Sequence, residues 1–364
     1  MPGEISVAFV GCGGMAAHYV NVYRELDGVR LACCIDVNLE SAQRAAAGAA
    51  ATTDFCAALQ PDIDALIVNT PNSLHRKHAV AALEAGKHLL LQKPVAANLA
   101  DAEAIEQVAA RSTRTAGLYM SYFDQPLMHD LRDMVSQGRL GDIVHCYARL
   151  MHTGGMMWSM EALGGTPNWR ASLEQTGGGC FIQLGVHYIH LFEWITGARV
   201  RRVTGATRRL HCPGLEGEDL ASALLELDSG AIITLDMAWC ARGEELSVHG
   251  TRGRFNYRES QWLSIASSAG SFRGRVVEYS AGLIDAFGGA QGEERQFEIH
   301  PPAFGDAANP FNQHRAFVEA ARDGRPSPVS IAWASATCAW LPQSTRPPVP
   351  GGPWRFSELR DCRR

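Results

Sequence analysis

The sequence lacks the long apolar run that a transmembrane helix needs. No stretch approaches the roughly 18 consecutive apolar residues that span a bilayer, so we expect no membrane segment. The first residues contain no basic segment followed by a long apolar stretch, which predicts a cytoplasmic protein without a secretion signal. An excess of positive charge is also missing. Acidic and basic residues are mixed along the chain and the net charge is −5, which argues against a nucleic-acid partner.

The ten cysteines form no CxxC pair, and most of them lie in apolar, strand-like segments. In a chain of 364 residues this pattern favours the buried thiols of a cytosolic protein over a disulfide framework. The thirteen histidines are scattered as well. His75 with His78, and His187 with His190, have a three-residue spacing, but no cysteine or carboxylate set completes a ligand group beside them. The sequence therefore predicts no metal site.

What the sequence does contain is an ordinary globular composition, with 46% hydrophobic and 20% charged residues. The length suggests two domains. The first 120 residues alternate short apolar runs with helical segments, which predicts a parallel sheet covered by helices. The expected strands are Ile5–Val10, Val29–Ile35, Ala65–Asn69, Lys87–Leu91 and Thr115–Tyr119. The expected helices are Met15–Leu26, an Ala-rich segment ending at Ala49, Leu74–Ala85 and Leu99–Ala110.

The pattern changes after residue 122, where a helix over Gln125–Gln137 precedes more widely spaced strands. These strands predict one mixed or antiparallel sheet, interrupted by a helix around Phe181–Ile195. They are expected at Ile143–Leu150, Val200–Leu210, Leu220–Leu227, Ala231–Trp239, Glu245–His249 and Gly253–Tyr257. The Gly-rich segment Ser267–Ala308 is expected to be loop with some strand, and helical periodicity returns at Pro310–Asp323. We predict an α/β domain over 1–122, an α+β domain over 123–340 and a Pro-rich tail over 341–364.

A glycine-rich turn follows the first strand. Gly11, Gly13 and Ala16 form a GxGxxA pattern between a strand and a helix. Gly11 permits a tight turn, Gly13 lets the backbone approach a pyrophosphate, and Ala16 keeps the helix close to the sheet. The helix N-terminus then supplies N–H groups for the phosphates. This pattern predicts a doubly wound Rossmann domain that holds a dinucleotide through Gly11, Gly13, Gly14, Met15 and Ala16.

Asp36 ends the second strand, twenty residues beyond Ala16. Its carboxylate can accept both ribose hydroxyls of the adenosine and would repel a 2′-phosphate, and no arginine follows it in Val37 or Asn38. The sequence therefore favours NAD over NADP as the cofactor. The alternative is that the glycines and Asp36 only shape a turn and cap the next helix. The agreement of strand, glycines and acid with the dinucleotide rule argues against that alternative.

Further motifs lie where ligands of this fold bind. The segments Asn69–His75 and Leu89–Pro94 end two predicted strands, and Gly177–His187 lies in the second domain. With Ala82–His88, Asn168–Arg170 and His249–Gly253, these motifs resemble the Gfo/Idh/MocA oxidoreductases, the family of glucose–fructose oxidoreductase and inositol dehydrogenase. The resemblance runs from about Ile5 to Ser330.

The resemblance implies that Lys93 touches the reacting hydroxyl and the nicotinamide ribose, and that His187 donates or accepts a proton at the substrate. Gln92 and Gln183 stand where the family commonly has glutamate and aspartate, so the site lacks two carboxylates. Without them, a partly desolvated Lys93 should lose its proton more easily beside the positive nicotinamide of NAD⁺. We expect both residues to share the proton transfer, with His187 as the general base because its unperturbed pKa is about 6.5. Gln183 would hydrogen-bond a substrate hydroxyl.

Other residues extend the two candidate sites, and each has a structural alternative. The cofactor site is extended to Thr70, Pro71, Asn72, His75, Gln92 and Lys93, and the substrate pocket to Tyr122, Trp169 and Arg170. Asn72 and His75 can instead cap the next helix, and Lys93 can be an ordinary surface lysine. The aromatic residues and His187 can belong to the core.

A nicotinamide site with a lysine–histidine pair and no metal predicts hydride transfer at a carbinol carbon. The resemblance points to a secondary ring hydroxyl of a sugar, cyclitol or glycoside. Two alternatives stay open: an enzyme that keeps its NAD and cleaves or epimerises a glycoside without net redox change, and a non-catalytic sugar or NAD sensor, which would not need Lys93 and His187. The resemblance also implies a homodimer or homotetramer formed through the second-domain sheet. The apolar residues on both faces of Ala231–Trp239 are compatible with a buried outer face.

Overall fold

The computed structural model describes residues 4–259, 272–279, 292–299, 306–331 and 354–355. The chain forms two compact units. The first unit consists of residues Met1–Asp124, Glu174–Gly177 and Ala303–Leu341, and the second of Gln125–Leu173, Gly178–Pro302 and Pro342–Arg364. Within the described ranges, no helix combines the length and the apolar character needed to cross a bilayer.

Six parallel strands form the sheet of the first unit, in the order β3-β2-β1-β4-β5-β6. This is the strand order of doubly wound dinucleotide-binding domains, and it confirms the predicted Rossmann fold. Every residue of β1 and β4 is buried, as expected for strands covered on both faces. The strands are β1 (Ile5–Val10), β2 (Val29–Ile35), β3 (Ala50–Thr52), β4 (Ala65–Val68), β5 (His88–Gln92) and β6 (Ala116–Tyr119). The short β3 was not predicted from the sequence.

Four helices follow these strands: α1 (Gly14–Glu25), α2 (Leu39–Ala46), α3 (His75–Glu84) and α4 (Leu99–Arg111). Asn38 and Asn98 cap the N-termini of α2 and α4, because each side chain accepts a backbone N–H of the first turn. The second helix ends at Ala46, earlier than the predicted Ala49. Ala47 and Gly48 have φ angles of 43° and 107°, a left-handed backbone that terminates a helix.

The helix α9 (Gln313–Arg322) belongs to the first unit, where it packs against α1. Phe317 and Val318 join the same buried cluster as Tyr19 and Tyr23 of α1. The side chain of Gln313 also ties α9 to β6, accepting a hydrogen bond from the Met120 N–H and donating one to the Leu118 carbonyl. The sequence assigned this helix to a second domain over 123–340. The chain returns because the apolar face of α9 completes the core beneath α1.

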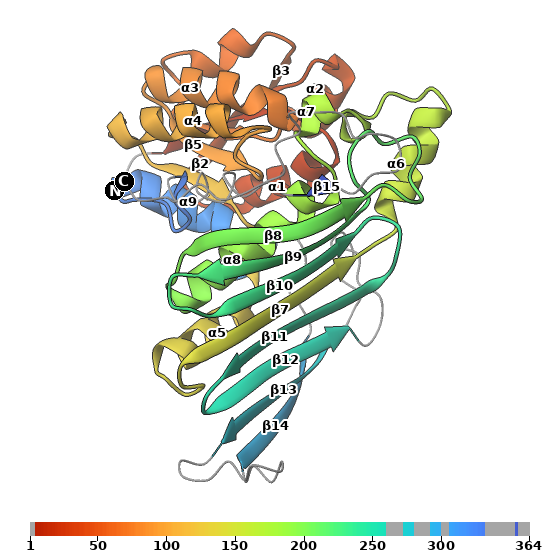
Figure 1. The fold of residues 1–364 in the computed structure, drawn as a ribbon. Helices are drawn as coiled ribbons and strands as arrows, with labels where there is room; N and C mark the ends of the chain where they lie inside the picture. The colour runs from red at the N-terminus through yellow and green to blue at the C-terminus, as the bar shows by residue number, and fades with distance from the viewer. Residues whose placement is uncertain (1–3, 260–271, 280–291, 300–305, 332–353, 356–364) are drawn as a thin grey trace. The chain divides into compact units, whose positions relative to one another are not determined.

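The second unit is built on a nine-stranded mixed sheet in the order β14-β13-β12-β11-β7-β10-β9-β8-β15. Among the described strands of this second sheet, only β7 and β10 pair in parallel. The strands are β7 (Ile143–Met151), β8 (Val200–Arg208), β9 (Leu220–Leu227), β10 (Ile232–Ala238), β11 (Gly243–Gly250), β12 (Gly253–Glu259), β13 (Phe272–Tyr279), β14 (Gly292–Ile299) and β15 (Trp354–Arg355). Figure 1 shows α5 (Pro126–Ser136) and α8 (Val186–Thr196) covering one face of this sheet.

Two predictions for this unit fall partly outside the described residues. The segment 267–308, predicted as loop with some strand, contains β13 and β14. Of the predicted tail over 341–364, only residues 354–355 are described, and they form β15 against β8. The rest of that tail lies outside the described residues.

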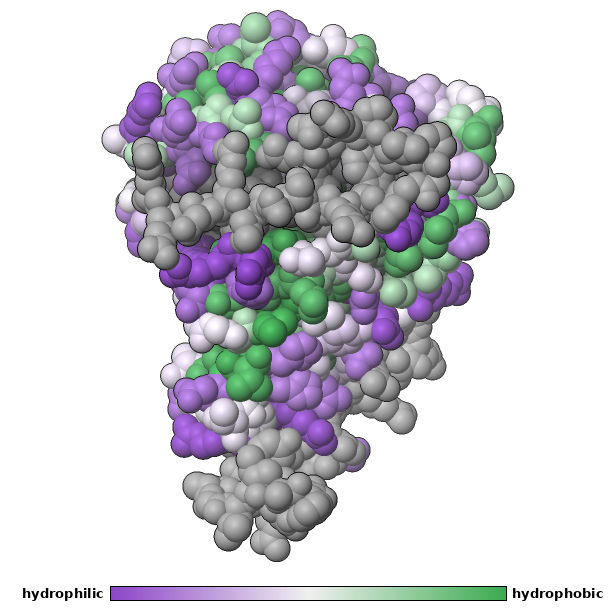
Figure 2. Space-filling view, in the orientation of Figure 1, coloured by the Kyte–Doolittle hydropathy of each residue, from purple (hydrophilic) through white to green (hydrophobic). Residues whose placement is uncertain are grey.

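The open face of the second sheet is mixed in polarity. Asp236 of β10 lies on it and accepts hydrogen bonds from the hydroxyls of Tyr147 (3.0 Å) and Ser222 (2.6 Å). Leu224 and Ile232 are 52% and 42% exposed, and Figure 2 shows hydrophobic and hydrophilic side chains interspersed over this face. The outward face of β10 is thus apolar only in part, since Ile232 lies on it together with the polar Thr234 and Asp236. The homo-oligomer stays a prediction.

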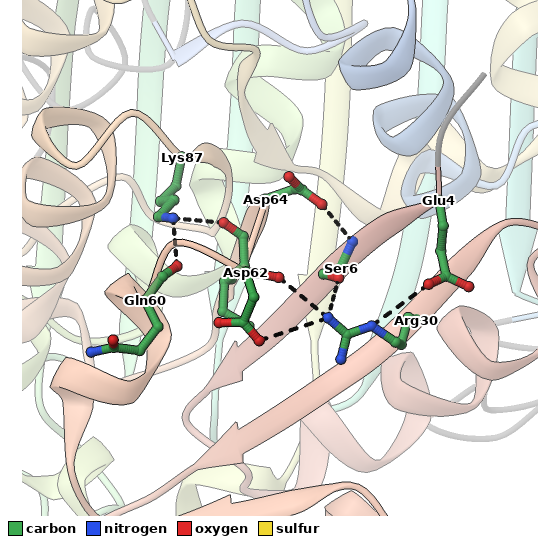
Figure 3. A network of polar contacts seen from close by, with 8 residues as sticks. Glu4, Ser6, Arg30, Gln60, Asp62, Asp64 and Lys87 are labelled. Carbon is green, nitrogen blue, oxygen red and sulfur yellow. Dashed lines mark hydrogen bonds and ion pairs between the residues drawn. The ribbon is translucent and has the colours of Figure 1, made fainter.

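A polar network closes the amino edge of the first sheet, where its strands begin (Figure 3). The Ser6 N–H donates to the Asp64 carboxylate at 2.8 Å. The Arg30 guanidinium donates to the Ser6 hydroxyl and lies 3.6 Å from Glu4 and 3.8 Å from Asp62. These contacts satisfy polar groups at the strand starts, so this edge serves the stability of the fold.

Candidate active site

The glycine loop after β1 combines a tight turn with open space. Gly11 has φ +88°, and a Cβ there would lie 2.7 Å from the Asn69 carbonyl carbon, so only glycine fits. At Gly13 and Gly14, in contrast, a Cβ would meet no atom of the described residues within 4 Å. The loop is thus packed on its sheet side and open at the start of α1. This arrangement leaves room for a pyrophosphate beside the backbone N–H groups.

Asp36 lies at the end of β2 beside that loop. Its Oδ2 accepts the Cys12 N–H at 2.7 Å and its Oδ1 accepts the Asn38 N–H at 2.8 Å. These two bonds fix the carboxylate in place. A carboxylate has about four acceptor positions, so both oxygens can still accept a ribose hydroxyl. The geometry therefore suits the adenosine ribose of a dinucleotide.

The turn after β4 contains one donor that sequence reasoning did not include in the site. The Asn69 Nδ2 is buried and makes no hydrogen bond within the described part of the chain. A buried amide donor without an acceptor is costly unless a ligand completes it. Its place directly after a strand at the ligand-binding edge was the signal that could have identified it. Together with the open space at Gly13, this donor fits a bound dinucleotide.

Asn72 and Thr70 use their side chains within the protein. The Asn72 amide is buried and donates to the Thr176 carbonyl at 2.8 Å, while the Thr70 hydroxyl lies 3.2 Å from the His78 Nδ1. Pro71 lies between them and starts a short 3₁₀ turn over Asn72–Leu74. These side chains shape the turn that follows β4.

His75 joins the two loops that follow β4 and β5. Its side chain is fully buried, with Nδ1 2.9 Å from the Pro94 carbonyl and Nε2 2.9 Å from the Thr70 carbonyl. Burial lowers the pKa of His75 to about 4, and the positive charge of Lys93 adds to this effect while the carbonyls oppose it. Both ring nitrogens face backbone atoms. His75 thus positions the two loops and caps no helix with its side chain, and its contact with the cofactor stays a prediction.

Gln92 holds the strand end from which Lys93 projects. Its Nε2 donates to the Tyr19 hydroxyl on α1 at 3.1 Å, and its Oε1 accepts the Lys93 N–H at 2.9 Å. The half-buried Lys93 precedes Pro94 across a cis peptide bond. Because β1, β4 and β5 are adjacent, the glycine loop, Asn69 and Lys93 share one sheet edge. Gln92 acts through the backbone of that edge.

In the second unit, Glu218 dictates the last glycine of the triplet, Gly179. A Cβ at Gly179 would lie 1.9 Å from the Glu218 carbonyl oxygen. The Glu218 carboxylate accepts the N–H groups of Gly179 (2.8 Å) and Phe181 (3.0 Å), and burial raises its pKa. A π-helix, Phe181–Gly185, follows and leads into α8. Such turns often occur at functional sites, and this one presents the buried Gln183 and then the half-buried His187.

The predicted pocket residues are divided between the units. Tyr122 belongs to the first unit and is 7% exposed. Trp169 and Arg170 belong to the second, in a short 3₁₀ helix, Trp169–Ala171, capped by Asn168. Lys93 lies in the first unit and His187 in the second. Their convergence beside a nicotinamide ring stays a prediction.

No group of three or more His, Cys, Asp or Glu side chains is arranged to hold a metal ion in the ranges that the structure describes.

Several known proteins with similar sequences are oxidoreductases of sugars or cyclitols by name. The chain is 28% identical to 1,5-anhydro-D-fructose reductase of Ensifer adhaerens over 198 residues, which cover 53% of this chain and 56% of that protein. It is 25% identical to scyllo-inositol 2-dehydrogenase (NAD(+)) of Bacillus subtilis over 305 residues, covering 79% and 84%. The first of these matches spans little more than half of the relative's length.

A solved structure of levoglucosan dehydrogenase in complex with NADH has a similar fold. Its TM-score is 0.75 at 19% identity, over 92% of this chain and 94% of that one. Residues 5–120 match the oxidoreductase family with an NAD-binding Rossmann fold, and residues 128–256 match the Gfo/Idh/MocA C-terminal domain. The two matches share one family and together take in about two thirds of the chain. This chain belongs to the Gfo/Idh/MocA family of NAD-binding oxidoreductases.

Proposed function

We propose that the chain is an NAD-dependent dehydrogenase acting on a secondary ring hydroxyl of a sugar, cyclitol or glycoside. The observation that carries this proposal is the carboxyl edge of the first sheet. There an open glycine loop, a fixed carboxylate at Asp36 and the side chain of Lys93 follow adjacent strands. The printed names of the sequence relatives support the substrate class.

In this proposal, backbone N–H groups at Gly13 and Gly14 hold the pyrophosphate, and Asp36 holds the adenosine ribose. Asn69 contributes its buried amide donor. Bound NAD⁺ supplies the hydride acceptor. The carboxylate at Asp36 also repels a 2′-phosphate, which favours NAD over NADP.

The protein side chains handle the proton of the reacting hydroxyl. His187 accepts it as general base, and Lys93 hydrogen-bonds the same oxygen and shares the transfer. Gln183 donates a hydrogen bond to a neighbouring hydroxyl and carries no proton. Because Gln92 and Gln183 are neutral, no carboxylate at either position stabilises the Lys93 ammonium.

A panel of sugars, cyclitols and glycosides with NAD⁺ or NADP⁺ tests the proposal. Wild-type protein is expected to accumulate NADH absorbance with at least one compound and to prefer NAD⁺. Lys93→Met and His187→Gln are each expected to lower the rate by about 10²–10⁴-fold. NAD⁺ binding, followed by calorimetry, should persist in His187→Gln. An unchanged rate and pH profile in His187→Gln would refute the general-base assignment.

The same assay separates the remaining alternatives. An enzyme that recycles its NAD would convert a glycoside without accumulating NADH, and a sensor would bind ligand without converting it. A clear preference for NADP⁺ would contradict the role of Asp36.

A further inference from the structure

Arg170 has an unusual environment for a charged side chain. Its guanidinium carbon lies 4.5 Å from the centroid of the Trp169 ring and 5.0 Å from that of Trp158, on α6 (Gly154–Leu163). Trp158 is itself braced edge-on by Trp239 at 5.2 Å. Burial lowers the pKa of Arg170, and the negative charge of Glu161 opposes this effect. Two aromatic rings thus hold a half-buried cation in one orientation.

This guanidinium has no anionic partner among the described residues. No hydrogen bond or ion pair joins it to a carboxylate there, and only its backbone N–H is bonded, to Asn168. Glu161 is the carboxylate whose charge acts on Arg170, but the Asn168 amide holds it at 2.7 Å. A guanidinium held against aromatic rings, with no carboxylate bonded to it, keeps its planar set of N–H donors available for an anion. An anion that binds there can accept these hydrogen bonds.

The location of Arg170 connects it with the proposed substrate site of the second unit. β7 and β10 are parallel and end together, so His152 with α6 and Trp239 leave the sheet at the same edge. The π-helix that precedes His187 is anchored at this edge too, since the Cys180 thiol donates to the Met237 carbonyl at 3.4 Å. The aromatic cluster and the start of the His187 helix therefore arise from one corner of the unit.

We infer that the substrate carries a carboxylate and that Arg170 binds it, which makes the preferred substrate a sugar acid or a glycoside of one. This inference rests on the proposed function. The planar guanidinium matches the two oxygens of a carboxylate in a bidentate pair. The rings of Trp158 and Trp169 fix the plane of the guanidinium before the ligand arrives, so little conformational entropy is lost on binding.

Paired ligands test the inference without requiring turnover. Each pair is a neutral sugar and its uronic acid: glucose with glucuronate, and galactose with galacturonate. Calorimetry on the NAD⁺-loaded protein is expected to show an acid of at least one pair binding ten or more times more tightly than its neutral partner. Glucose 6-phosphate and galactose 6-phosphate form a third arm, and tighter binding of the phosphates than of the acids would overturn the carboxylate assignment.

Substitutions of Arg170 test whether its side chain causes the preference for acids. Arg170→Met is expected to abolish the preference for acids over neutral sugars. Arg170→Lys is expected to reduce it, because lysine keeps the charge but lacks the planar guanidinium that binds both carboxylate oxygens. Arg202→Met removes an exposed arginine paired with Glu226 in the same unit and should leave the preference unchanged. Equal binding of acids and neutral sugars, absence of binding by any acid, or a preference that survives in Arg170→Lys and Arg170→Met alike would overturn the inference.

The two proposals fail separately. Lys93→Met and His187→Gln should lose turnover yet retain the preference for acids. If wild-type protein binds the acids through Arg170 but reduces no NAD⁺, the dehydrogenase proposal fails while the carboxylate site stands.

Discussion

The two edges of the first sheet are made by the same strands and serve opposite purposes. At the amino edge, polar groups bond to one another: Arg30 faces two carboxylates, and the buried Lys87 ammonium donates to the Gln60 and Ile63 carbonyls at 2.7 and 2.6 Å (Figure 3). At the carboxyl edge, Gly13 faces open space and the Asn69 amide has no acceptor among the described residues.

The comparison shows how one sheet separates stability from binding. Donors and acceptors that are satisfied inside the protein stabilise the fold and have nothing left for a ligand. Donors that are held rigidly but left unsatisfied are ready to bind one. Substitutions at the amino edge should therefore change the free energy of unfolding alone, whereas those at the open part of the carboxyl edge should change NAD binding.

The largest effect is expected for Gly11→Ala. The new Cβ would lie within 3 Å of the Asn69 and Thr70 backbones, at a φ that alanine disfavours. We expect a loss of stability of about 2–5 kcal/mol together with loss of NAD binding. Chemical denaturation and calorimetry measure the two effects.

Gly13→Ala is the matched control, because its Cβ meets no atom of the described residues. Stability should change by less than about 1 kcal/mol, while NAD⁺ affinity falls at least about tenfold because the methyl group occupies the space for the pyrophosphate. Unchanged NAD⁺ affinity would show that the open space is not the cofactor site.

The next prediction concerns the loss of folding stability at low pH, to which His75 contributes. The folded pKa of His75 is lowered to about 4 from 6.5, so the unfolded chain binds the proton more readily. The stability from the neutral ring is complete above pH 6.5 and is lost as the pH falls towards 4, on the order of 3 kcal/mol. His75→Gln should flatten this loss in denaturation measured between pH 7 and 4. A slope as steep as that of the wild type would contradict the assignment to His75.

Lys87→Met removes two charged hydrogen bonds from the amino edge. We expect a loss of about 2 kcal/mol, because two buried carbonyls lose their donor. The dissociation constant of NAD⁺ should not change. A weakened NAD⁺ complex in a variant that is still folded would break the distinction between the edges.

Arg30→Gln should have the smallest effect, below about 1 kcal/mol, because its ion pairs are exposed and screened by salt. The difference from the wild type should shrink further at 1 M salt. A loss as large as that of Lys87→Met would mean that the Arg30 pairs contribute much more than exposed pairs normally do.

Much of the first unit could be predicted because its signals are local. The alternation of apolar runs and helices, the spacing of Gly11, Gly13 and Ala16, and the acid at Asp36 all lie within short segments. The roles of Gln92 and His75 could not be predicted in this way. Their partners, Tyr19 and the Pro94 carbonyl, are identified only once the loops are packed.

The sequence by itself determined the Rossmann sheet, the glycine loop and the family motifs, because periodicity and turn chemistry act between near neighbours. Only the tertiary structure decided that α9 returns to the first unit and that Arg170 lies against Trp158, with no carboxylate of the described residues bound to it. These features depend on burial and on contacts between segments distant in the chain. Such contacts leave no periodic trace in the sequence, since many residue pairs would satisfy the same pattern.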